Sequence, residues 1–457
     1  MRCTQATTTT AVGSEVVSAG QTKRIVTLSK DSTRFLGPFW RRLLNITYAT
    51  EITRCEVCGG IELESVLDLG KHPLCDDLVP EGDSRICIEH PIEILFCSNC
   101  ATAHQRFQIP KQELFPPTYH YRSRFTSDVV RGMAALADAC ETRIGSLRGI
   151  RVLDIGCNDG SLLDCFRERG AITAGIEPTD AWRDALGRGH EISHGFFSPD
   201  AARDLRTTWG IPDIVTFTNV FAHIENLPMV LEALRSLLAP QTMLVIENHY
   251  LGSVLDRHQF DTFYHEHPRT YSLTSFEHIA RSLGLPVTAV EFPSRYGGNI
   301  RVFIGGDRNW QGGAASQVQS VLDGEQHFPK RLREMQFAVE RWRTAMAGRI
   351  HRLSAEHGRL SAKAFPARAA ILVKLLGLDV SVLEAVYEKP GSMKIGHYVP
   401  GTRIPIRSDE LLFASLAQPR VILNLAWHIS SEIRAYLAQQ GYAGDVVDII
   451  DPDSFAS

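Results

Sequence analysis

One short segment, VLDIGCNDGSLL at residues 152–163, constrains the fold more than any other part of the chain. It combines an apolar strand, a turn with two glycines and a helix start, which is typical of a doubly wound α/β sheet. Gly156 and Gly160 would let a ligand approach the backbone closely at the carboxyl edge of that sheet. Alone, the loop is weak evidence, because many nucleotide sites and plain tight turns share it.

An acidic residue that closes the next predicted strand strengthens this interpretation. Glu177 lies 17 residues after Gly160 and could accept hydrogen bonds from both hydroxyls of a ribose. A dinucleotide site would favour G-x-G-x-x-G, whereas Asn158 replaces the middle glycine and Asp154 adds a negative charge. The pattern therefore favours a cationic ligand without phosphate, such as S-adenosylmethionine. The alternative is a structural turn followed by a surface glutamate.

Two further segments fit the same pocket. Phe196 and Phe197 could flank an adenine, and the stretch from Asn219 to His223 follows a predicted strand where donor and acceptor should meet. Each segment also has a plainer interpretation. The two phenylalanines could be core aromatics, and His223 could merely cap the following helix.

The alternation of strands and helices continues beyond this loop and predicts an α/β protein of several domains. Expected strands include residues 171–176, 214–218, 243–247 and 300–304, and a second series begins near residue 361. We expect a small N-terminal module, a central domain with a doubly wound sheet, and a second α/β domain after it. The expected boundaries are 1–50 for a disordered extension, 51–126 for the N-terminal module, which the cysteines described below make a zinc-binding module, 127–325 for the central domain, 326–358 for an amphipathic connecting helix, and 359–457 for the C-terminal domain. The resemblance described below implies that the central domain is a Rossmann-like methyltransferase domain and that the C-terminal domain is Rossmann-like.

Composition excludes several classes of protein. The 457 residues carry a formal charge of -4, without the basic excess that nucleic-acid binding usually requires. No run approaches the roughly 18 apolar residues of a membrane span, and the first 50 residues lack a secretory core. We therefore expect a cytoplasmic protein that acts on a small molecule, with no nucleic-acid or membrane partner. The oligomeric state is open, and a monomer is compatible with the sequence.

Ten cysteines in such a chain point to metal binding more than to disulfides. Cys55 and Cys58 form one C-x-x-C pair, Cys97 and Cys100 form another, and 38 residues separate the pairs. Two such turns can present four thiolates to one zinc ion, so we expect a structural site without an open position. A redox dithiol or two chance pairs are the alternatives.

Residues 260–272, FDTFYHEHPRTYS, hold an unusual density of titratable groups. His267 can take a proton near neutral pH, Glu266 can orient or polarise an imidazole, and Tyr264 can donate to a developing oxyanion. This combination suits enolisation next to a ketone. Metal binding by His265, Glu266 and His267, or a polar loop without chemistry, are the alternatives.

Together these residues resemble those of the sugar C-methyltransferases, which methylate carbon 3 of nucleotide-linked 4-keto-deoxysugars in antibiotic biosynthesis. The likeness covers nearly everything after residue 54. It includes the four cysteines, the segments YHYRS at 119–123, GGNIRV at 297–302, PGTRIPI at 400–406 and LAWHISSEI at 425–433, and the motifs described above.

The resemblance implies a zinc-bearing module, an S-adenosylmethionine domain and a third domain that helps to hold the acceptor. It implies that Tyr119 and Tyr121 line the sugar pocket, with His223 where donor and acceptor meet. It further implies that His267 removes the proton alpha to the ketone, assisted by Tyr264 and Glu266.

The chain departs from the family pattern on the acceptor side. The family usually has a glycine-rich stretch with a lysine where this chain reads AFPARAAI at 364–371, and the expected lysine falls near Ala370. Proline and isoleucine cannot form the open backbone nest that glycines allow. Arg368 could replace the lost charge, or the acceptor could be another keto metabolite. A non-catalytic binding protein is a third hypothesis, disfavoured by the intact titratable loop.

Overall fold

The computed structural model describes residues 49–116, 121–306, 315–415, 418–451 and 455. Residues 1–48 of the expected disordered extension therefore lie outside the described residues, and so does Tyr119.

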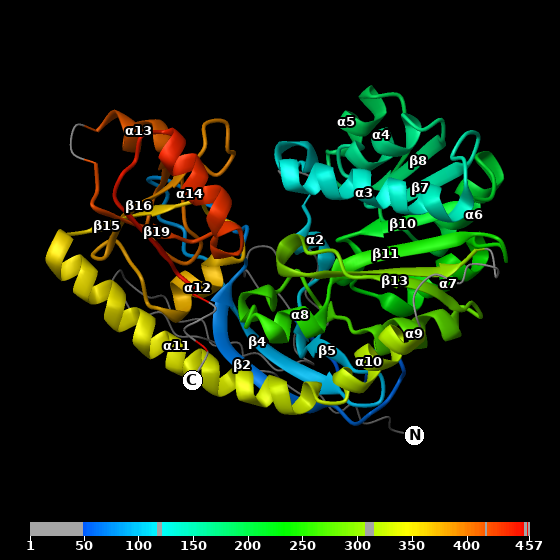
Figure 1. The fold of residues 1–457 in the computed structure, drawn as a ribbon, viewed down its shortest axis with the longest axis horizontal. Helices are drawn as coiled ribbons and strands as arrows, with labels where there is room; N and C mark the ends of the chain where they lie inside the picture. The colour runs from blue at the N-terminus through cyan, green and yellow to red at the C-terminus, as the bar shows by residue number, and fades with distance from the viewer. Residues whose placement is uncertain (1–48, 117–120, 307–314, 416–417, 452–454, 456–457) are drawn as a thin grey trace, which may run out of the picture. The chain divides into compact units, whose positions relative to one another are not determined.

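The N-terminal module is built on an antiparallel sheet of order β12-β5-β4-β2 (Figure 1). Its strands are β2 (Glu64–Pro73), β4 (Glu89–Cys97), β5 (Thr102–Gln105) and β12 (Arg269–Thr270). β12 is far away in the sequence from the other three strands and lies near the carboxyl end of the titratable loop, residues 260–272. It pairs Arg269 with His104 and Thr270 with Ala103, so the module's sheet holds the carboxyl end of that loop.

The central sheet has seven strands in the order β13-β14-β11-β10-β7-β8-β9. The strands are β7 (Arg151–Ile155), β8 (Ile172–Glu177), β9 (Glu191–His194), β10 (Ile214–Thr218), β11 (Met243–His249), β13 (Val287–Glu291) and β14 (Asn299–Gly305). β7 to β11 are parallel, whereas β14 runs antiparallel to both β11 and β13. The order reverses between β7 and β10, which is where a doubly wound sheet opens a binding crevice at its carboxyl edge.

Two separate apolar cores cover the two faces of this sheet, as a doubly wound fold requires. Along β7, Val152 belongs to one core, while Leu153 and Ile155 belong to the other. Helices α3 (Ser127–Ile144) and α4 (Ser161–Arg167) contribute to the first core. The second core contains residues of α6 (Pro199–Thr208), α7 (Leu227–Leu237) and α9 (Leu273–Ser282).

The C-terminal sheet is entirely parallel, in the order β18-β16-β15-β19-β20. Its strands are β15 (Leu360–Lys363), β16 (Leu383–Glu388), β18 (Ile406–Ser408), β19 (Val421–Asn424) and β20 (Asp445–Asp448). The order again reverses beside the first strand, between β15 and β19. The altered 364–371 stretch follows β15 and leads into α12 (Ala369–Leu375), so it lies at this second switch point.

A long helix, α11 (Phe328–His357), follows α10 (Ala315–Glu325) and precedes the C-terminal sheet. Its buried face packs in one continuous core with β2, β4, β15 and β19. Trp342 on this helix donates a hydrogen bond to the Ile449 carbonyl at 3.0 Å. The helix therefore contacts the N-terminal sheet as well as the C-terminal one. Across the described stretches, no helix has the length and apolar character needed to cross a membrane.

Candidate functional site

The glycine loop after β7 adopts a backbone that few side chains permit. Gly156, Asn158 and Gly160 have φ angles of 74°, 50° and 79°. A Cβ at Gly156 would lie 2.6 Å from a methyl group of Val220, and one at Gly160 would lie 3.0 Å from the Ala185 Cβ. Gly156 is needed for close approach at the cavity, whereas Gly160 lets α4 begin tightly against α5 (Trp182–Gly187).

Glu177 ends β8 and holds this loop in place. Its carboxylate accepts hydrogen bonds from the Asn158 backbone N–H at 2.9 Å and from the Thr179 N–H at 2.9 Å. Burial raises the pKa of Glu177, although these hydrogen bonds oppose the shift. The Thr179 hydroxyl also donates to this carboxylate, at 2.5 Å. Two carboxylate oxygens can accept about four hydrogen bonds, so Glu177 retains capacity for about one more, from a single ribose hydroxyl.

Asp154 is buried within the sheet and does not line the cavity. It accepts a hydrogen bond from the Thr216 hydroxyl at 2.6 Å, on the neighbouring strand β10. Burial raises the pKa of Asp154 to about 7, and the charge of Glu177 adds to the effect. These two buried carboxyl groups suit a cationic ligand, because a nearby positive charge stabilises the ionised form of a carboxyl group.

One cavity of about 580 Å³ brings the predicted donor and acceptor residues together. Its wall includes Gly156, Asn158, Glu177, Phe197, Asn219 and His223 from the donor side, Tyr121, Tyr264, Glu266 and His267, and Arg368 from the C-terminal domain. The imidazole of position 267 and the glycine loop therefore share one cavity.

Phe197 and His223 both reach this cavity. Phe197 lies in the apolar core as well, with its ring edge-on to Phe217 at 6.2 Å. The idea that His223 caps the next helix is wrong, because Asn226 caps α7 by accepting from the Met229 N–H. His223 Nδ1 instead donates to the Glu266 carbonyl at 2.7 Å.

His267 is held in one tautomer. Its Nδ1 donates to the Thr262 carbonyl at 2.9 Å, which leaves the lone pair on Nε2. The rings of Tyr264, His223 and His249 surround it, with centroids at 4.3, 4.8 and 5.3 Å. Burial, together with His223 and His249, lowers the pKa of His267 well below its usual range, so the ring is neutral.

The sequence led us to expect that Glu266 orients the His267 imidazole, but it does not. The Thr262 carbonyl takes that role, and only the backbone of Glu266 holds an imidazole, that of His223. The Glu266 side chain is 4% exposed, and within the described chain its carboxyl group makes no hydrogen bond. Burial and the charge of Asp76 raise the pKa of Glu266 well above its usual range, which favours the protonated acid at the cavity wall.

His265 points away from the cavity. Its Nε2 donates to the His90 carbonyl at 3.1 Å, and its ring packs edge-on against His90. Among the described residues, no group containing His265, Glu266 and His267 is placed to hold a metal. The metal interpretation of this run is therefore wrong, because successive residues face different parts of the molecule.

Tyr121 and Arg368 both line the cavity, although they are far apart in the sequence. The Tyr121 backbone carbonyl accepts from the Asn158 side chain at 3.1 Å, which ties this segment to the donor loop. The Arg368 guanidinium is paired with Asp261 at 2.8 Å. Arg368 therefore does not carry an uncompensated charge.

Sequence reasoning missed two polar residues at strand ends, of which His249 lines the cavity and Asn299 lies behind it. His249 ends β11 beside His267, where burial lowers its pKa to about 3. Asn299 begins β14 and donates to Asn219 at 3.2 Å and to Glu247 at 3.0 Å. For His249, the sequence did offer a signal, since it is a polar residue at the carboxyl end of a central strand. Nothing local marked Asn299, because its strand is antiparallel.

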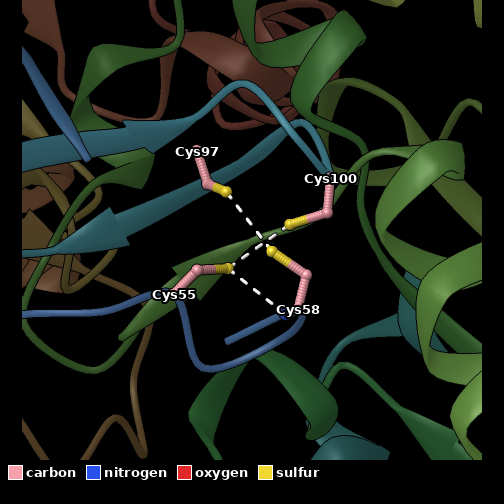
Figure 2. A group of neighbouring side chains, drawn as sticks. All are labelled: Cys55, Cys58, Cys97 and Cys100. Atoms are coloured by element: carbon pink, nitrogen blue, oxygen red, sulfur yellow. Dashed lines mark hydrogen bonds between the residues drawn. The ribbon is translucent and has the colours of Figure 1, made fainter. Parts of the chain in front are cut away.

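The four predicted cysteines meet at one point (Figure 2). Their sulfurs lie within 4.8 Å of one another, with Cys55 and Cys100 at 3.3 Å and Cys58 and Cys97 at 3.5 Å. A tetrahedral zinc with Zn–S bonds of about 2.3 Å requires sulfurs about 3.8 Å apart, so the cluster fits zinc.

The chemistry of the donor set supports the same metal. Hydrogen bonds from Cys100 and Cys55 lower the pKa of Cys97, while contacts with Cys55 and Cys97 raise the pKa of Cys100. Four thiols at this separation cannot all ionise unless a cation lies between them. The set has no fifth position for a substrate, which is typical of a structural site.

Family models match the chain in three consecutive parts. A "Putative zinc binding domain" matches residues 55–115, a "Methyltransferase domain" matches 120–290, and a "C-methyltransferase C-terminal domain" matches 294–447. The chain is a C-methyltransferase. It uses S-adenosylmethionine as methyl donor, and its four-cysteine cluster belongs to the zinc-binding domain.

Known proteins similar to this C-methyltransferase include C-methyltransferase NovU of Streptomyces niveus, which is 28% identical over 84% of this chain and 91% of its own length. Ubiquinone biosynthesis O-methyltransferase of Haemophilus ducreyi is 27% identical, over 23% of this chain and 48% of its own. Among solved structures, magnesium protoporphyrin IX methyltransferase (ChlM) of Synechocystis PCC 6803 with bound SAM is 16% identical in sequence. The match covers 39% of this chain and 79% of that protein, with a TM-score of 0.28.

Replacing one sulfur ligand should empty the metal site of the C-methyltransferase. We expect Cys97→Ser to lose the one zinc per chain and to lower the melting temperature, because the turns at both C-x-x-C pairs depend on the ion. Elemental analysis and thermal unfolding measure this. Cys87→Ser is the control, since Cys87 is buried outside the cluster. Full zinc occupancy in Cys97→Ser would contradict the assignment.

A methyl group added at Gly156 should block the donor. We expect Gly156→Ala to weaken S-adenosylmethionine binding about tenfold or more, because the Cβ meets Val220 and the positive φ adds about 1–2 kcal/mol of strain. Calorimetric titration with S-adenosylhomocysteine measures it. Gly145→Ala is the control, since Gly145 also has a positive φ, 85°, but nothing lies within 4 Å of its Cβ position. Equal weakening in both variants would reject the role of Gly156.

Proposed function

We propose that this enzyme methylates the carbon alpha to a ketone, at C3 of a nucleotide-linked 4-keto-deoxysugar, through an enolate. The observation that carries the proposal is the shared cavity of His267 and the glycine loop. A base and a methyl-donor site on one cavity are what such a reaction requires, because proton removal and methyl transfer act on the same carbon.

His267 is the proposed base. Its Nε2 is the nitrogen that can take a proton, since Nδ1–H is committed to the Thr262 carbonyl. The ring is neutral before reaction because burial lowers its pKa. The C–H electron pair becomes the enolate, and the proton goes to Nε2. The charged imidazolium then faces the negative enolate, which compensates in part for its burial.

Tyr264 and Glu266 are the proposed stabilisers of the enolate oxygen. Burial raises the pKa of Tyr264 well above its usual value, so its hydroxyl remains a donor. A protonated Glu266 would supply a second donor at the same wall. Preorganised donors of this kind stabilise a developing oxyanion without reorganising.

The donor side positions the methyl group that the enolate attacks. When bound, S-adenosylmethionine supplies an electrophilic methyl on a sulfonium, and S-adenosylhomocysteine leaves once the new C–C bond has formed. We propose that Gly156, Asn158 and Asn219 hold it through the backbone. Asp154 and Glu177 favour its positive charge, Glu177 accepts a hydrogen bond from its ribose, and Phe197 packs beside the adenine.

The acceptor is proposed to lie between the 264–267 run and the C-terminal domain, contacting Tyr121, His223 and Arg368. The likeness to the sugar C-methyltransferases and to NovU supports a deoxysugar. A different keto metabolite is the second candidate, because the wall around Arg368 consists of Phe365, Pro366 and Ala367 in place of a glycine-rich turn.

Removing the base should separate enolisation from donor binding. We expect His267→Asn to slow deuterium exchange next to the ketone of thymidine diphosphate 4-keto-6-deoxyglucose by about 100- to 10,000-fold, with unchanged affinity for S-adenosylmethionine. Proton NMR in heavy water follows the exchange. His265→Asn is the control, because that histidine faces His90. No exchange with the wild-type enzyme would reject the sugar, and normal exchange in His267→Asn would reject the base.

The acid limb of the exchange rate should lie below about pH 6.5, the usual pKa of histidine. His267 acts in its neutral form, and its pKa is lowered in the free protein. Activity is therefore kept as pH falls past 6.5 and is lost only when pH passes the lowered value. Initial rates at low acceptor concentration, from pH 5 to 8, test this. An acid limb at or above 6.5 would contradict it.

A further inference from the structure

Arg368 forms a buried ion pair that joins the C-terminal domain to the titratable loop. Its Nε donates to Asp261 Oδ2 at 2.8 Å, and the Trp427 indole N–H donates to the same oxygen at 3.0 Å. Arg368 is 8% exposed and Asp261 is 1% exposed. The other carboxylate oxygen, Oδ1, is buried and has no hydrogen-bond partner in the described structure. Asp261 therefore depends on these two donors.

A second contact of the same guanidinium reaches Gln259, which in turn contacts Gly297. Arg368 Nη2 donates to Gln259 Oε1 at 3.3 Å, and Gln259 Nε2 donates to the Gly297 carbonyl at 2.9 Å. Gln259 is fully buried. Because two edges of the guanidinium are engaged, Arg368 holds the segment from Gln259 to Asp261 at both ends.

This segment leads directly to the orientation of His267. Asp261 is the middle residue of a single turn, η3 (Phe260–Thr262). The carbonyl of the next residue, Thr262, accepts the hydrogen bond that fixes His267 Nδ1. A rotation of that short turn would move the Thr262 carbonyl, and the imidazole would lose its tautomer and its direction together.

We propose that Arg368 is a positioning residue for carbanion formation, which acts through Asp261 and Thr262 on His267. This inference rests on the proposed function, since it takes His267 as the base. It replaces the expectation that Arg368 serves mainly as a free cation for the acceptor. Arg368 precedes α12 in the C-terminal domain, and its side chain reaches Asp261 in the titratable loop.

The test compares exchange rates at saturating acceptor. We expect Arg368→Met to slow deuterium exchange by about 10- to 100-fold, the effect typical of a misplaced catalytic group, with little change in the affinity for S-adenosylmethionine. Arg368→Lys should recover part of the rate, because it restores the charge but not the planar fork that reaches Asp261 and Gln259 together. Asp261→Asn should resemble Arg368→Met.

A double-variant comparison keeps the test valid if Arg368→Met folds poorly. Arg368→Met with Asp261→Asn removes the buried carboxylate that the single variant leaves unpaired. We expect the double variant to be no slower in exchange than either single variant, since all three lose the same interaction. Multiplied losses would contradict a shared route through Asp261.

Lys374→Met is the matched control. Lys374 lies on the same helix, α12, and pairs with Glu89 on β4 at 2.6 Å, so it too links the C-terminal domain to another part of the chain. It does not line the cavity or contact the 259–262 segment. We expect wild-type exchange in Lys374→Met.

The outcomes separate this inference from the proposed function. No exchange in the wild-type enzyme would remove both. Normal wild-type exchange with an equal maximal rate in Arg368→Met would overturn the positioning role alone. A raised KM for the acceptor with an unchanged maximal rate would overturn it in favour of direct acceptor binding.

Discussion

The pairing of β12 with β5 is the interaction on which the rest of the site depends. Arg269 and Thr270 lie in the titratable loop, two and three residues after His267, and they form a strand of the N-terminal sheet. The neighbouring strands β4 and β5 carry two of the zinc-binding cysteines at their shared turn. His104 on β5 contacts Cys55 Sγ at 3.3 Å and lies opposite Arg269. A metal site with no catalytic position of its own thus fixes one end of the loop that we propose does the chemistry, because backbone pairing transmits its geometry over a few residues.

Much of the fold could be predicted from the sequence because it follows local patterns. The run from Val152 to Leu163 gave β7 and the start of α4, since strand, glycine turn and helix each have a short-range signal. The amphipathic stretch near residue 328 gave α11 for the same reason. The edge strand β18 and the two-residue β12 could not be found, because strands so short have no periodicity and are defined by their partners.

The candidate site was predictable in its residue types and less so in its contacts. His267, Tyr264 and Glu266 stand out by composition, yet the group that fixes the His267 tautomer is a backbone carbonyl, which no side-chain pattern reveals. His249 and Asn299 enter from strands far away in the sequence. Arg368 was noticed as a departure from a family pattern, but its partner Asp261 lies 107 residues away, and only the tertiary fold shows that the two charges meet.

Buried charge explains why the two halves of this cavity differ. On the donor side, burial raises the pKa values of Asp154 and Glu177, and a ligand that brings a positive charge would stabilise their ionised forms. On the loop side, His267, His223 and His249 are neutral rings near the guanidinium of Arg368, which the Asp261 carboxylate compensates. An anionic intermediate would be favoured there, since a proton gained by His267 and a negative charge on the substrate appear in the same step. The positions of these charges therefore match the proposed reaction, in which a cationic methyl donor meets a carbanion.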